Sequence, residues 1–545
     1  MMNWLQRKFD YNEHLVTYFA RCFNIDPLII KILFSRNIKT EKQITNYMYP
    51  EMEDLHDPFL LNDMKKAVYR IAKAIQRKEN IVIFGDYDAD GITSSCLLYK
   101  ALYFLKAEVN VVLPLRKEGY GLSATAVERI HNEFNASLIV TVDNGSNAHE
   151  ALATAKEKGI DVIVTDHHEI TNGIPLCYAF INPMREDSTY PFRRLAGVGV
   201  ALKVTQALFQ AGKMNWQKHI WNYLELAAIG TVADVMPLVD ENRIIVSLGL
   251  SKMNMNPSSI IKHWKQALKI EYFTSTDIAF RIAPMINASG RVDNPNHAVS
   301  LFIKDSVNPS DLFYFERVNE IRKKLVEEQY VKLENHILEH KYCDQDVIVA
   351  QGEYDEGIIG ILAAKAAQRF LKPSIIIDST GKGSARSVQN KEFSIINTIQ
   401  RASSHLSKFG GHQAAAGLSM EVSNLSNFRN AIQLSAQEEP KIEPMLFYDF
   451  ERSFEDFPKT LIDDFQLLEP TGMGNLKPIF KTTSQINHVE VFGKKSDHLK
   501  LIFKQKEALF FSMGSLIQEF TDNTPYHFLY TVNSKKNFLI HGYDK

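Results

Sequence analysis

The chain has 545 residues, enough for roughly three to four domains with a hydrophobic core in each. A formal net charge of −2 and an isoelectric point near 6.8 exclude a globally basic nucleic-acid-binding protein, so any such surface must be local. No apolar run approaches the roughly 18 residues that span a bilayer, and the four cysteines show no Cys-x-x-Cys spacing. These features predict a cytoplasmic protein with reduced thiols and no membrane segment.

The distribution of apolar residues predicts a mixed α/β architecture. Residues 1–75 show short helical patterns broken by prolines, which indicates a small helical cap or arm. From about residue 76 to 255, apolar runs alternate with helix-like stretches, the βαβ rhythm of a parallel sheet. Residues 309–342 predict a long connecting helix, and residues 346–435 predict a second α/β unit. Beyond Pro440 the pattern shortens to alternating strands, which suits a small barrel.

Acidic residues follow the first strand of the predicted sheet. The apolar run at residues 81–84 leads into Gly85-Asp86-Tyr87-Asp88-Ala89-Asp90-Gly91. Asp88 and Asp90 are two positions apart, so an extended backbone directs both carboxylates to one side. Such a pair can chelate a cation. The same loop is also compatible with a solvated turn that caps a helix starting near Thr93.

Two further strands end in the same kinds of residue. Residues 138–142 lead into Asp143, and residues 162–165 lead into Asp166, His167 and His168. Because ligands of a parallel sheet bind outside the carboxyl ends of its strands, we expect these side chains to meet the first loop in one crevice. Carboxylates and neutral imidazoles gathered there favour divalent cations such as Mg²⁺ or Mn²⁺. Taken alone, Asp-Asn-Gly after the second strand is a turn signal.

Two more segments extend this constellation. Asp234 is a single carboxylate in the apolar stretch of residues 228–238, where an unpaired charge is costly, so we expect a cation as its partner. Residues 281–291 carry Arg281 and Arg291 among small residues, which we interpret as a loop suited to bidentate phosphate contacts.

Together these motifs resemble the RecJ family of single-strand-specific DNA exonucleases, in the DHH phosphoesterase superfamily. The resemblance rests on the segments above and on Phe409-Gly410-Gly411-His412 followed by Ala415-Ala416-Gly417, and it covers nearly the whole chain. It implies an N-terminal helical region, a DHH parallel-sheet domain, a connecting helix, a DHH-associated α/β domain and a C-terminal OB-fold β-barrel. The corresponding ranges are residues 1–75, 76–300, 301–345, 346–438 and 439–545.

The resemblance also implies 5′ to 3′ hydrolysis of single-stranded DNA to mononucleotides, in DNA repair and recombination, with two Mn²⁺ or Mg²⁺ ions. It places Asp88 on one ion, Asp143 between the two ions, and His168 on the scissile phosphate. The second ion is assigned to Asp90, His167 and Asp234. Asp86 is a further candidate metal ligand, assigned to neither ion. The implied substrate contacts are Arg116, Arg281, Asn287, Arg291, Ser384, Arg386, Gly410, Gly411 and His412. A monomer is expected, with single-strand-binding protein and a helicase as candidate partners.

Alternatives remain open at several of these positions. Gly410-Gly411-His412 is also compatible with a tight turn before a small-residue helix at residues 414–417. In the barrel, Phe492 and Phe503 predict stacking on the bases of a single strand. Four lysines predict a basic track along the strand's backbone or, alternatively, a solvated charged face: Lys494, Lys495, Lys500 and Lys504.

Three residues depart from the family pattern. Phe84 stands where some members of the superfamily have a metal-binding histidine, Asp355 where many relatives have histidine, and Thr471 where an aromatic residue is usual. A DHH phosphodiesterase for short oligonucleotides or RNA would need the same metal ligands without a barrel. A non-catalytic nucleic-acid scaffold would not need the ligands.

Overall fold

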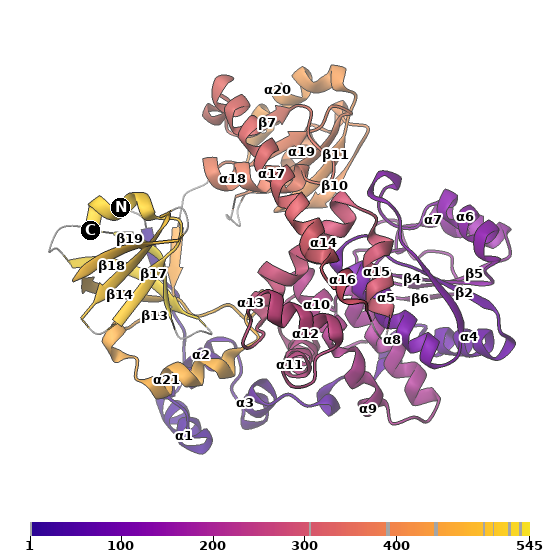
Figure 1. The fold of residues 1–545 in the computed structure, drawn as a ribbon, viewed down its shortest axis with the longest axis horizontal. Coiled ribbons are helices and arrows are strands. Elements are labelled where there is room, and N and C mark those ends of the chain that lie inside the picture. The colour runs from indigo at the N-terminus through magenta and orange to yellow at the C-terminus, as the bar shows by residue number, and fades with distance from the viewer. Residues whose placement is uncertain are drawn as a thin grey trace.

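The computed structural model describes residues 3–304, 307–388, 393–440, 445–493, 496–504, 506–520, 525–533 and 537–544. Figure 1 shows a large body of sheet and helices, a smaller α/β body at the far end of the long helix α17, and a β-barrel. None of the helices in the described part of the chain combines the length and apolar character that a membrane crossing requires. The three bodies confirm the predicted fold class.

The first sheet is parallel throughout, in the order β3-β2-β4-β5-β6. The apolar residues of its central strands are buried, as expected where helices cover both faces. The crossover helices are α5 (Ala89–Phe104), α6 (Ala124–Phe134) and α7 (His149–Glu157). The strands are β2 (Asn80–Phe84), β3 (Glu108–Val112), β4 (Leu138–Val142), β5 (Asp161–Thr165) and β6 (Ala179–Ile181).

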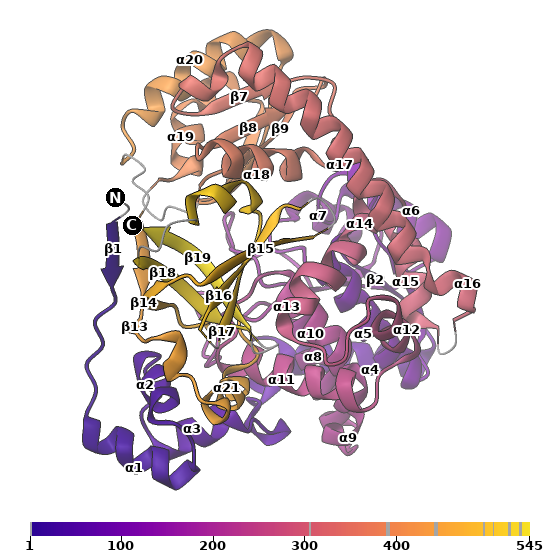
Figure 2. The same ribbon diagram turned by 60° about the vertical axis from the view of Figure 1, so that its left-hand side comes forward.

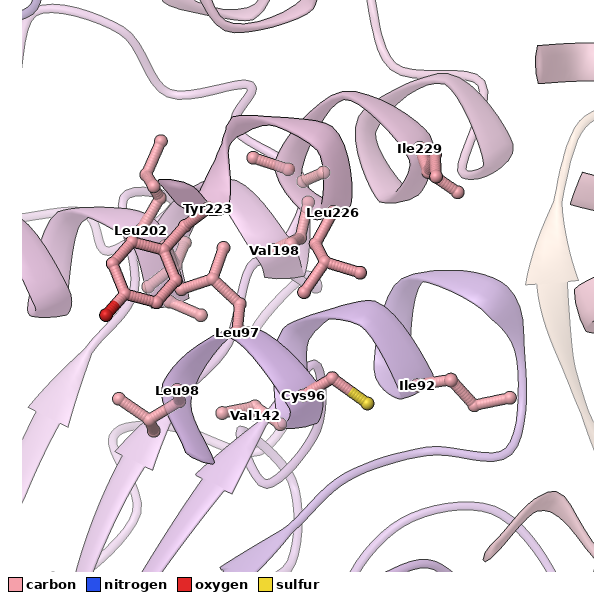
Figure 3. Packing of buried hydrophobic residues seen from close by; sticks show 14 of the residues in the cluster. Ile92, Cys96, Leu97, Leu98, Val142, Val198, Leu202, Tyr223, Leu226 and Ile229 are labelled. Carbon is pink, nitrogen blue, oxygen red and sulfur yellow. The ribbon is translucent and has the colours of Figure 1, made fainter. Parts of the chain in front are cut away.

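After β6 the described chain is helical as far as α17, so the expected βαβ rhythm was wrong beyond residue 181. The helices α8 (Gly197–Ala211) and α10 (Leu224–Ala233) are buried on nearly all sides, and an apolar run without periodicity does not distinguish a helix from a strand. Figure 3 shows how both helices pack against α5 in the main core. The others are α9 (Trp216–Ile220), α11 (Asp240–Met255), α12 (Ser259–Ala267), α13 (Ser275–Asp277), α14 (Ala283–Val292), α15 (Pro295–Ile303) and α16 (Pro309–Leu312).

The connecting helix α17 (Tyr314–Glu339) leads to the second sheet, in the order β10-β11-β9-β8-β7. Residues 415–419 form a strand that pairs with the Gly-Gly-His segment, so the alternative of a small-residue helix was wrong. The strands are β7 (Ile348–Gln351), β8 (Ser374–Ile377), β9 (Lys382–Arg386), β10 (Lys408–His412) and β11 (Ala415–Ser419). The helices are α18 (Ile359–Phe370), α19 (Ile395–Arg401) and α20 (Leu425–Ala436).

The barrel sheet has the order β13-β14-β18-β19-β17-β16-β15, and α21 (Lys459–Asp464) lies between β13 and β14 in the chain. Phe503 lies in its core and stacks on Phe454 at 4.6 Å, so the prediction that Phe503 stacks on bases was wrong. Lys494 and Lys495 lie outside the described residues. The strands are β13 (Phe450–Glu451), β14 (Phe480–Gln485), β15 (His488–Phe492), β16 (His498–Phe503), β17 (Lys506–Phe510), β18 (Pro525–Val532) and β19 (Phe538–Asp544).

The N-terminal region packs against the barrel. Strand β1 (Asn3–Gln6) pairs in parallel with β12 (Met445–Tyr448), which puts Asn3 opposite Met445. Figure 2 shows β1 beside the barrel, joined to α1 by an extended segment. The next helices share one hydrophobic core with barrel residues, whereas α4 (Met64–Arg77) belongs to the core of the first sheet. The three helices packed on the barrel are α1 (Glu13–Phe23), α2 (Pro27–Ser35) and α3 (Glu41–Met48).

Candidate metal centre and anion pocket

The loop after β2 is fixed between three helices. Asp88 is the N-cap of α5 and accepts a hydrogen bond from the amide of Gly91 at 3.0 Å. Asn287 of α14 accepts from the amide of Ala89 at 2.8 Å. The two carboxylate oxygens of Asp90 accept from the first amides of α8, those of Gly197 at 2.7 Å and Val198 at 2.9 Å. Helix N-termini stabilise negative charge, so α8 holds this carboxylate in place.

Asp143 and His167 meet at the carboxyl ends of β4 and β5. The Oδ1 atom of Asp143 lies 3.0 Å from Nε2 of His167. Asp143 has a left-handed φ of 61°. Gly197 lies so close that a Cβ on it would be 2.6 Å from the Cβ of Asp143. The hydroxyl of Tyr120 donates to the main-chain carbonyl of Asp143 at 2.8 Å. A tight backbone and a close helix therefore fix this carboxylate.

Asp166 orients the histidine pair. Its oxygens accept from Nδ1 of His168 at 2.8 Å, and from the amides of Ser146 at 2.9 Å and His167 at 2.7 Å. Burial opposes ionisation, but the hydrogen bond and charge of His168 lower the pKa of Asp166 well below its usual range. Conversely, burial disfavours protonation of His168, but Asp166 raises its pKa to about 9. These interactions favour the protonated form of His168, whose ring is half-exposed.

The carboxylates and histidines form overlapping groups. The ligand atoms of Asp86, Asp88 and Asp143 lie within 4.8 Å of one another, and so do those of Asp90, His167 and Asp234. A third group consists of Asp143, Asp166, His167 and His168. It shares Asp143 with the first group and His167 with the second. The contact between Asp143 and His167 thus joins the first two groups into one site.

The buried carboxylates of this site repel one another when they are ionised, so bound cations would stabilise their charged forms. Burial and the neighbouring carboxylates raise the pKa of Asp86 and Asp143 well above their usual range, and that of Asp90 to about 7. The same causes raise the pKa of Asp234 to about 9. Burial and His168 lower the pKa of His167 to about 4, so this imidazole is neutral, the form that binds metals.

Two unsatisfied atoms support this interpretation. Oδ1 of Asp86 and Oδ2 of Asp234 are buried and have no hydrogen-bond partner among the described residues. Buried polar atoms without a partner are rare in native proteins and indicate an ion, a water or a ligand. Oxygen-rich groups with one neutral imidazole suit Mn²⁺ or Mg²⁺. The residues present therefore fit two divalent cations.

Four arginines gather beside Asp86 and Asp88. Arg291 is half-buried, and desolvation together with Arg116, Arg322 and Arg386 lowers its pKa to about 10. The arginines donate to neutral acceptors. Arg116 reaches the carbonyl of Gly290, Arg291 that of Gly357, Arg386 the hydroxyl of Ser384, and Arg322 the side chain of Asn319. In the described part of the chain none of the four forms an ion pair, so the cluster suits an anion with several negative charges, such as a phosphate.

The remaining predicted contacts lie in different settings. Residues 281–291 form helix rather than the expected loop, because π-helical Ile278–Ile282 continues into α14. Arg281 pairs with Asp277 at 3.1 Å and donates to the carbonyl of Leu268, whereas Arg291 joins the arginine cluster. Gly410, Gly411 and His412 lie on the exposed edge strand β10, two strands from Ser384.

The three departures from the family pattern are also placed. Phe84 is the last residue of β2 and is fully buried in the hydrophobic core, so it contributes no ligand. Asp355 accepts from the amide of Gly357 at 2.8 Å, and Thr471 donates to Glu469 at 3.2 Å. Both are therefore engaged in local turns.

The sequence pattern placed Asp166 among the residues of the metal crevice but gave it no role, and it did not single out Tyr120 or Arg322 as site residues. For Asp166 the signal was present, because it follows β5 directly. Tyr120 and Arg322 lie in a loop and on a charged helix, where nothing in the sequence separates them from ordinary surface residues.

A parallel sheet whose strands end in these carboxylates and histidines, facing a second α/β body, defines a member of the DHH phosphoesterase superfamily. The family model described as the DHH family, N-terminal domain, matches residues 80–231, and the DHHA1 domain matches residues 344–438. The RecJ OB domain matches residues 448–537.

The chain belongs to the RecJ family. It is 33% identical to the single-stranded-DNA-specific exonuclease RecJ of Bacillus subtilis, over 94% of this chain and 66% of that protein. It is 30% identical to the RecJ of Haemophilus influenzae, over 88% of each chain. The crystal structure of RecJ in complex with Mn²⁺ from Thermus thermophilus matches all of this chain and 79% of that one, with a TM-score of 0.85 and 24% identity.

Proposed function

We propose that this chain is a metal-dependent exonuclease that hydrolyses single-stranded DNA from the 5′ end. The observation that carries the proposal is the contact between Asp143 and His167, which joins two candidate cation-binding groups. Next to them lies the arginine cluster, which has no counter-ion among the described residues. Phosphodiesters are the polyanionic substrate that such a pair of sites suits. The names of the RecJ relatives support single-stranded DNA as the polymer.

The proposed ligands follow the two groups in the structure. Asp88 and Asp86 would hold one ion, Asp90, His167 and Asp234 the other, and Asp143 both. Two divalent ions at such a site supply an activated water for in-line attack on phosphorus and stabilise the charge on the leaving oxygen. The protonated His168, held by Asp166, would donate a hydrogen bond to the scissile phosphate and stabilise its developing charge.

Recognition of the 5′ end is proposed for the arginine cluster. Arg116, Ser384 and Arg386 would bind the terminal phosphate, and Arg291 and Arg322 would add positive charge behind them. The ring of Tyr87 lies under Arg116 at 4.3 Å, which orients the guanidinium. Because these groups come from both α/β bodies, a strand end bound here would lie between them.

The barrel is proposed to contact the strand away from the chemistry. Phe492, His498 and Phe511 form a ring cluster on it, with centroids 5.1 to 5.9 Å apart, and Phe511 is 48% exposed. Lys500 pairs with Glu490 and Glu507, so it contributes little to a basic track. Sequence-tolerant stacking on exposed rings suits single strands.

A phosphodiesterase for short oligonucleotides or RNA is the second candidate, supported by the same metal ligands. A non-catalytic scaffold is disfavoured because every proposed metal ligand is present. Single-strand-binding protein and a helicase as partners, a monomeric state, a cytoplasmic location and a role in DNA repair and recombination also remain proposals.

A gel assay would test the proposed function. Oligonucleotides labelled at either end, as single strands, duplexes and RNA, would be incubated with Mn²⁺ or with chelator. We expect mononucleotides from the 5′ label first, on single-stranded DNA and only with metal. Release from the 3′ label first would contradict the polarity. Binding without hydrolysis in Mn²⁺ would favour a scaffold, and efficient cleavage only of very short strands or RNA would favour the second candidate.

A further inference from the structure

Two segments of the chain hold the group of Asp90, His167 and Asp234, which we call the second ligand group. The first is the segment of residues 194–198, which leads into α8. Its amides donate to both carboxylate oxygens of Asp90, and the main chain of Leu195 is a hydrogen-bond partner of the His167 ring. Any displacement of this segment therefore moves two of the three ligands.

Asp234 reaches the second ligand group from the end of α10. Its Oδ2 atom lies 3.6 Å from Nε2 of His167 and has no hydrogen-bond partner among the described residues. The position of this carboxylate therefore depends on the main chain that carries it. That chain turns sharply at Val235, which has a left-handed φ of 56°, and arrives at Pro237 at most about 11 Å further on.

A single buried side chain joins the two segments. Asn242, on the first turn of α11, is fully buried, and its Nδ2 atom donates to the carbonyl of Arg194 at 2.6 Å and to that of Pro237 at 3.1 Å. An amide nitrogen carries two hydrogens, so the two carbonyls use both of them. The Oδ1 atom is buried without a partner among the described residues, which costs stability. The contribution of Asn242 therefore lies in its two donors.

The neighbouring Glu241 fixes the helix that carries this cross-link. Its Oε1 atom accepts from Nζ of Lys203 on α8 at 2.8 Å, and its Oε2 atom accepts from the hydroxyl of Tyr190 at 2.5 Å. Both members of the ion pair are fully buried. Lys203 lies about 9 Å along the axis from the start of α8. Helix α11 is thus bonded to α8 at Lys203 and to its leading segment at Arg194, and two such points resist rotation of one helix against the other.

We propose that Asn242 is a positioning residue of the metal centre, whose two hydrogen bonds set the spacing between Asp234 and Asp90 and thereby the affinity of the second ligand group for its cation. The inference rests on the proposed function, since it takes this group to hold a divalent ion. Groups that orient metal ligands commonly change metal affinity by about 10–100-fold. Asp88 is held by the amide of Gly91 within its own loop, so the other ion should bind as before.

The test compares Asn242→Ala with the matched control Asn254→Ala. Asn254 lies at the other end of the same helix, and its Nδ2 atom also donates to two carbonyls, those of Leu250 at 2.9 Å and Phe273 at 3.1 Å. Mn²⁺ binding to the metal-free proteins would be measured by calorimetric titration without DNA, with melting temperature as the check on folding.

We expect the unsubstituted protein to bind two Mn²⁺ ions. Asn242→Ala should bind one of them about tenfold more weakly and the other within about twofold of the unsubstituted protein. Asn254→Ala should bind both ions normally, although it loses the same number of hydrogen bonds and its melting temperature should also fall. If Asn242→Ala does not unfold cooperatively, Asn242→Ser takes its place, because a hydroxyl can still donate to one of the two carbonyls.

The Mn²⁺ dependence of hydrolysis gives a second readout. The variant at Asn242 should need about tenfold more Mn²⁺ for half of its maximal rate, whereas kcat in saturating Mn²⁺ and KM for DNA should stay within about twofold. Unchanged Mn²⁺ binding, equal weakening of both ions, or the same weakening in Asn254→Ala would overturn the proposal. Fewer than two Mn²⁺ ions on the unsubstituted protein would instead overturn the proposed metal centre, on which this inference rests.

Discussion

The guanidinium of Arg243 lies 3.5 Å from the centre of the Tyr47 ring, and this contact joins three parts of the chain. Arg243 belongs to α11 of the first α/β body, and Tyr47 to α3, which packs on the barrel. The guanidinium donates to the carbonyl of Tyr47 and to four carbonyls of residues 467–470, at 2.7 to 3.3 Å. Burial lowers the pKa of Arg243 to about 10, and main-chain dipoles rather than a carboxylate compensate its charge.

We expect Arg243→Lys to lower the free energy of unfolding by about 3 kcal/mol, because one ammonium cannot satisfy five buried carbonyls. Urea unfolding and limited proteolysis between residues 440 and 470 would measure the effect. Arg369→Lys is the control, since Arg369 is 67% exposed and pairs with Glu334, and it should change stability by less than about 1 kcal/mol. Equal effects of the two substitutions would show that Arg243 does not connect the bodies.

Asp143→Asn should reduce hydrolysis by at least about 100-fold, because this carboxylate belongs to the group of Asp86 and Asp88 and lies 3.0 Å from His167 of the other group. Even outer partners of metal ligands cost about 10–100-fold. Without metal the variant should melt at the same or a higher temperature, since removing one charge relieves repulsion from Asp90 and Asp88. Mn²⁺ titration followed by thermal unfolding would show the loss of the metal-induced stabilisation. Near-normal turnover in saturating Mn²⁺ would contradict a shared ligand.

Metal removal should make stability depend on pH in a defined direction. The pKa of Asp90 is raised to about 7 and that of Asp234 to about 9, so the folded state binds more protons than the unfolded state. In the metal-free protein, the contribution of Asp90 and Asp234 to the free energy of unfolding is therefore greatest below about pH 4. It is lost as the pH rises to about 9. Mn²⁺ should cancel the loss, because the cation replaces the protons. Melting curves from pH 5 to 9 with and without Mn²⁺ would show whether the two slopes differ.

Arg386→Ala should weaken hydrolysis of 5′-phosphorylated strands much more than of 5′-hydroxyl strands, since charge-assisted hydrogen bonds contribute about 1.5–3 kcal/mol each. Arg322→Ala should act in the same direction with a smaller effect, because Arg322 donates to Asn319 and adds charge behind the pocket. Both substrates would be assayed side by side at fixed salt, with Arg369→Ala as the control. An equal loss on both substrates would mean that Arg386 holds the strand in general and that the end is bound elsewhere.

Much of the metal centre could be predicted from sequence because its geometry is local. Each of β2, β4 and β5 is a recognisable apolar run, and the residue after it must lie at the carboxyl edge of the sheet. Asp234 could be predicted because one carboxylate in an apolar stretch needs a partner. The roles of these residues in metal binding and of the arginines in substrate binding remain predictions.

Three other features could not be predicted, because they depend on packing between residues that are far apart in the sequence. Residues 281–291 resemble a loop in sequence, but neighbouring elements hold Pro284 and Gly290 within a helix, where Gly290 allows close approach to the carbonyl of Tyr87. Phe503 follows the apolar Ile502, so the sequence does not show which of the two side chains faces the barrel core; the paired strands bury Phe503. The contact of α1–α3 with the barrel joins residues more than 400 positions apart, which no local pattern encodes.

The parallel pairing of β1 with β12 also sets an order of events during synthesis. Asn3 can pair with Met445 only after Met445 has been synthesised. At a synthesis rate of about 5–20 residues per second, β1 and α1–α3 are made roughly 20–90 s before the barrel residues that they contact. The sheet around β2 and its ligands can form during that interval, whereas the apolar faces of α1–α3 stay uncovered. The amino-terminal arm is thus the first part of the chain to be made and among the last to find its place.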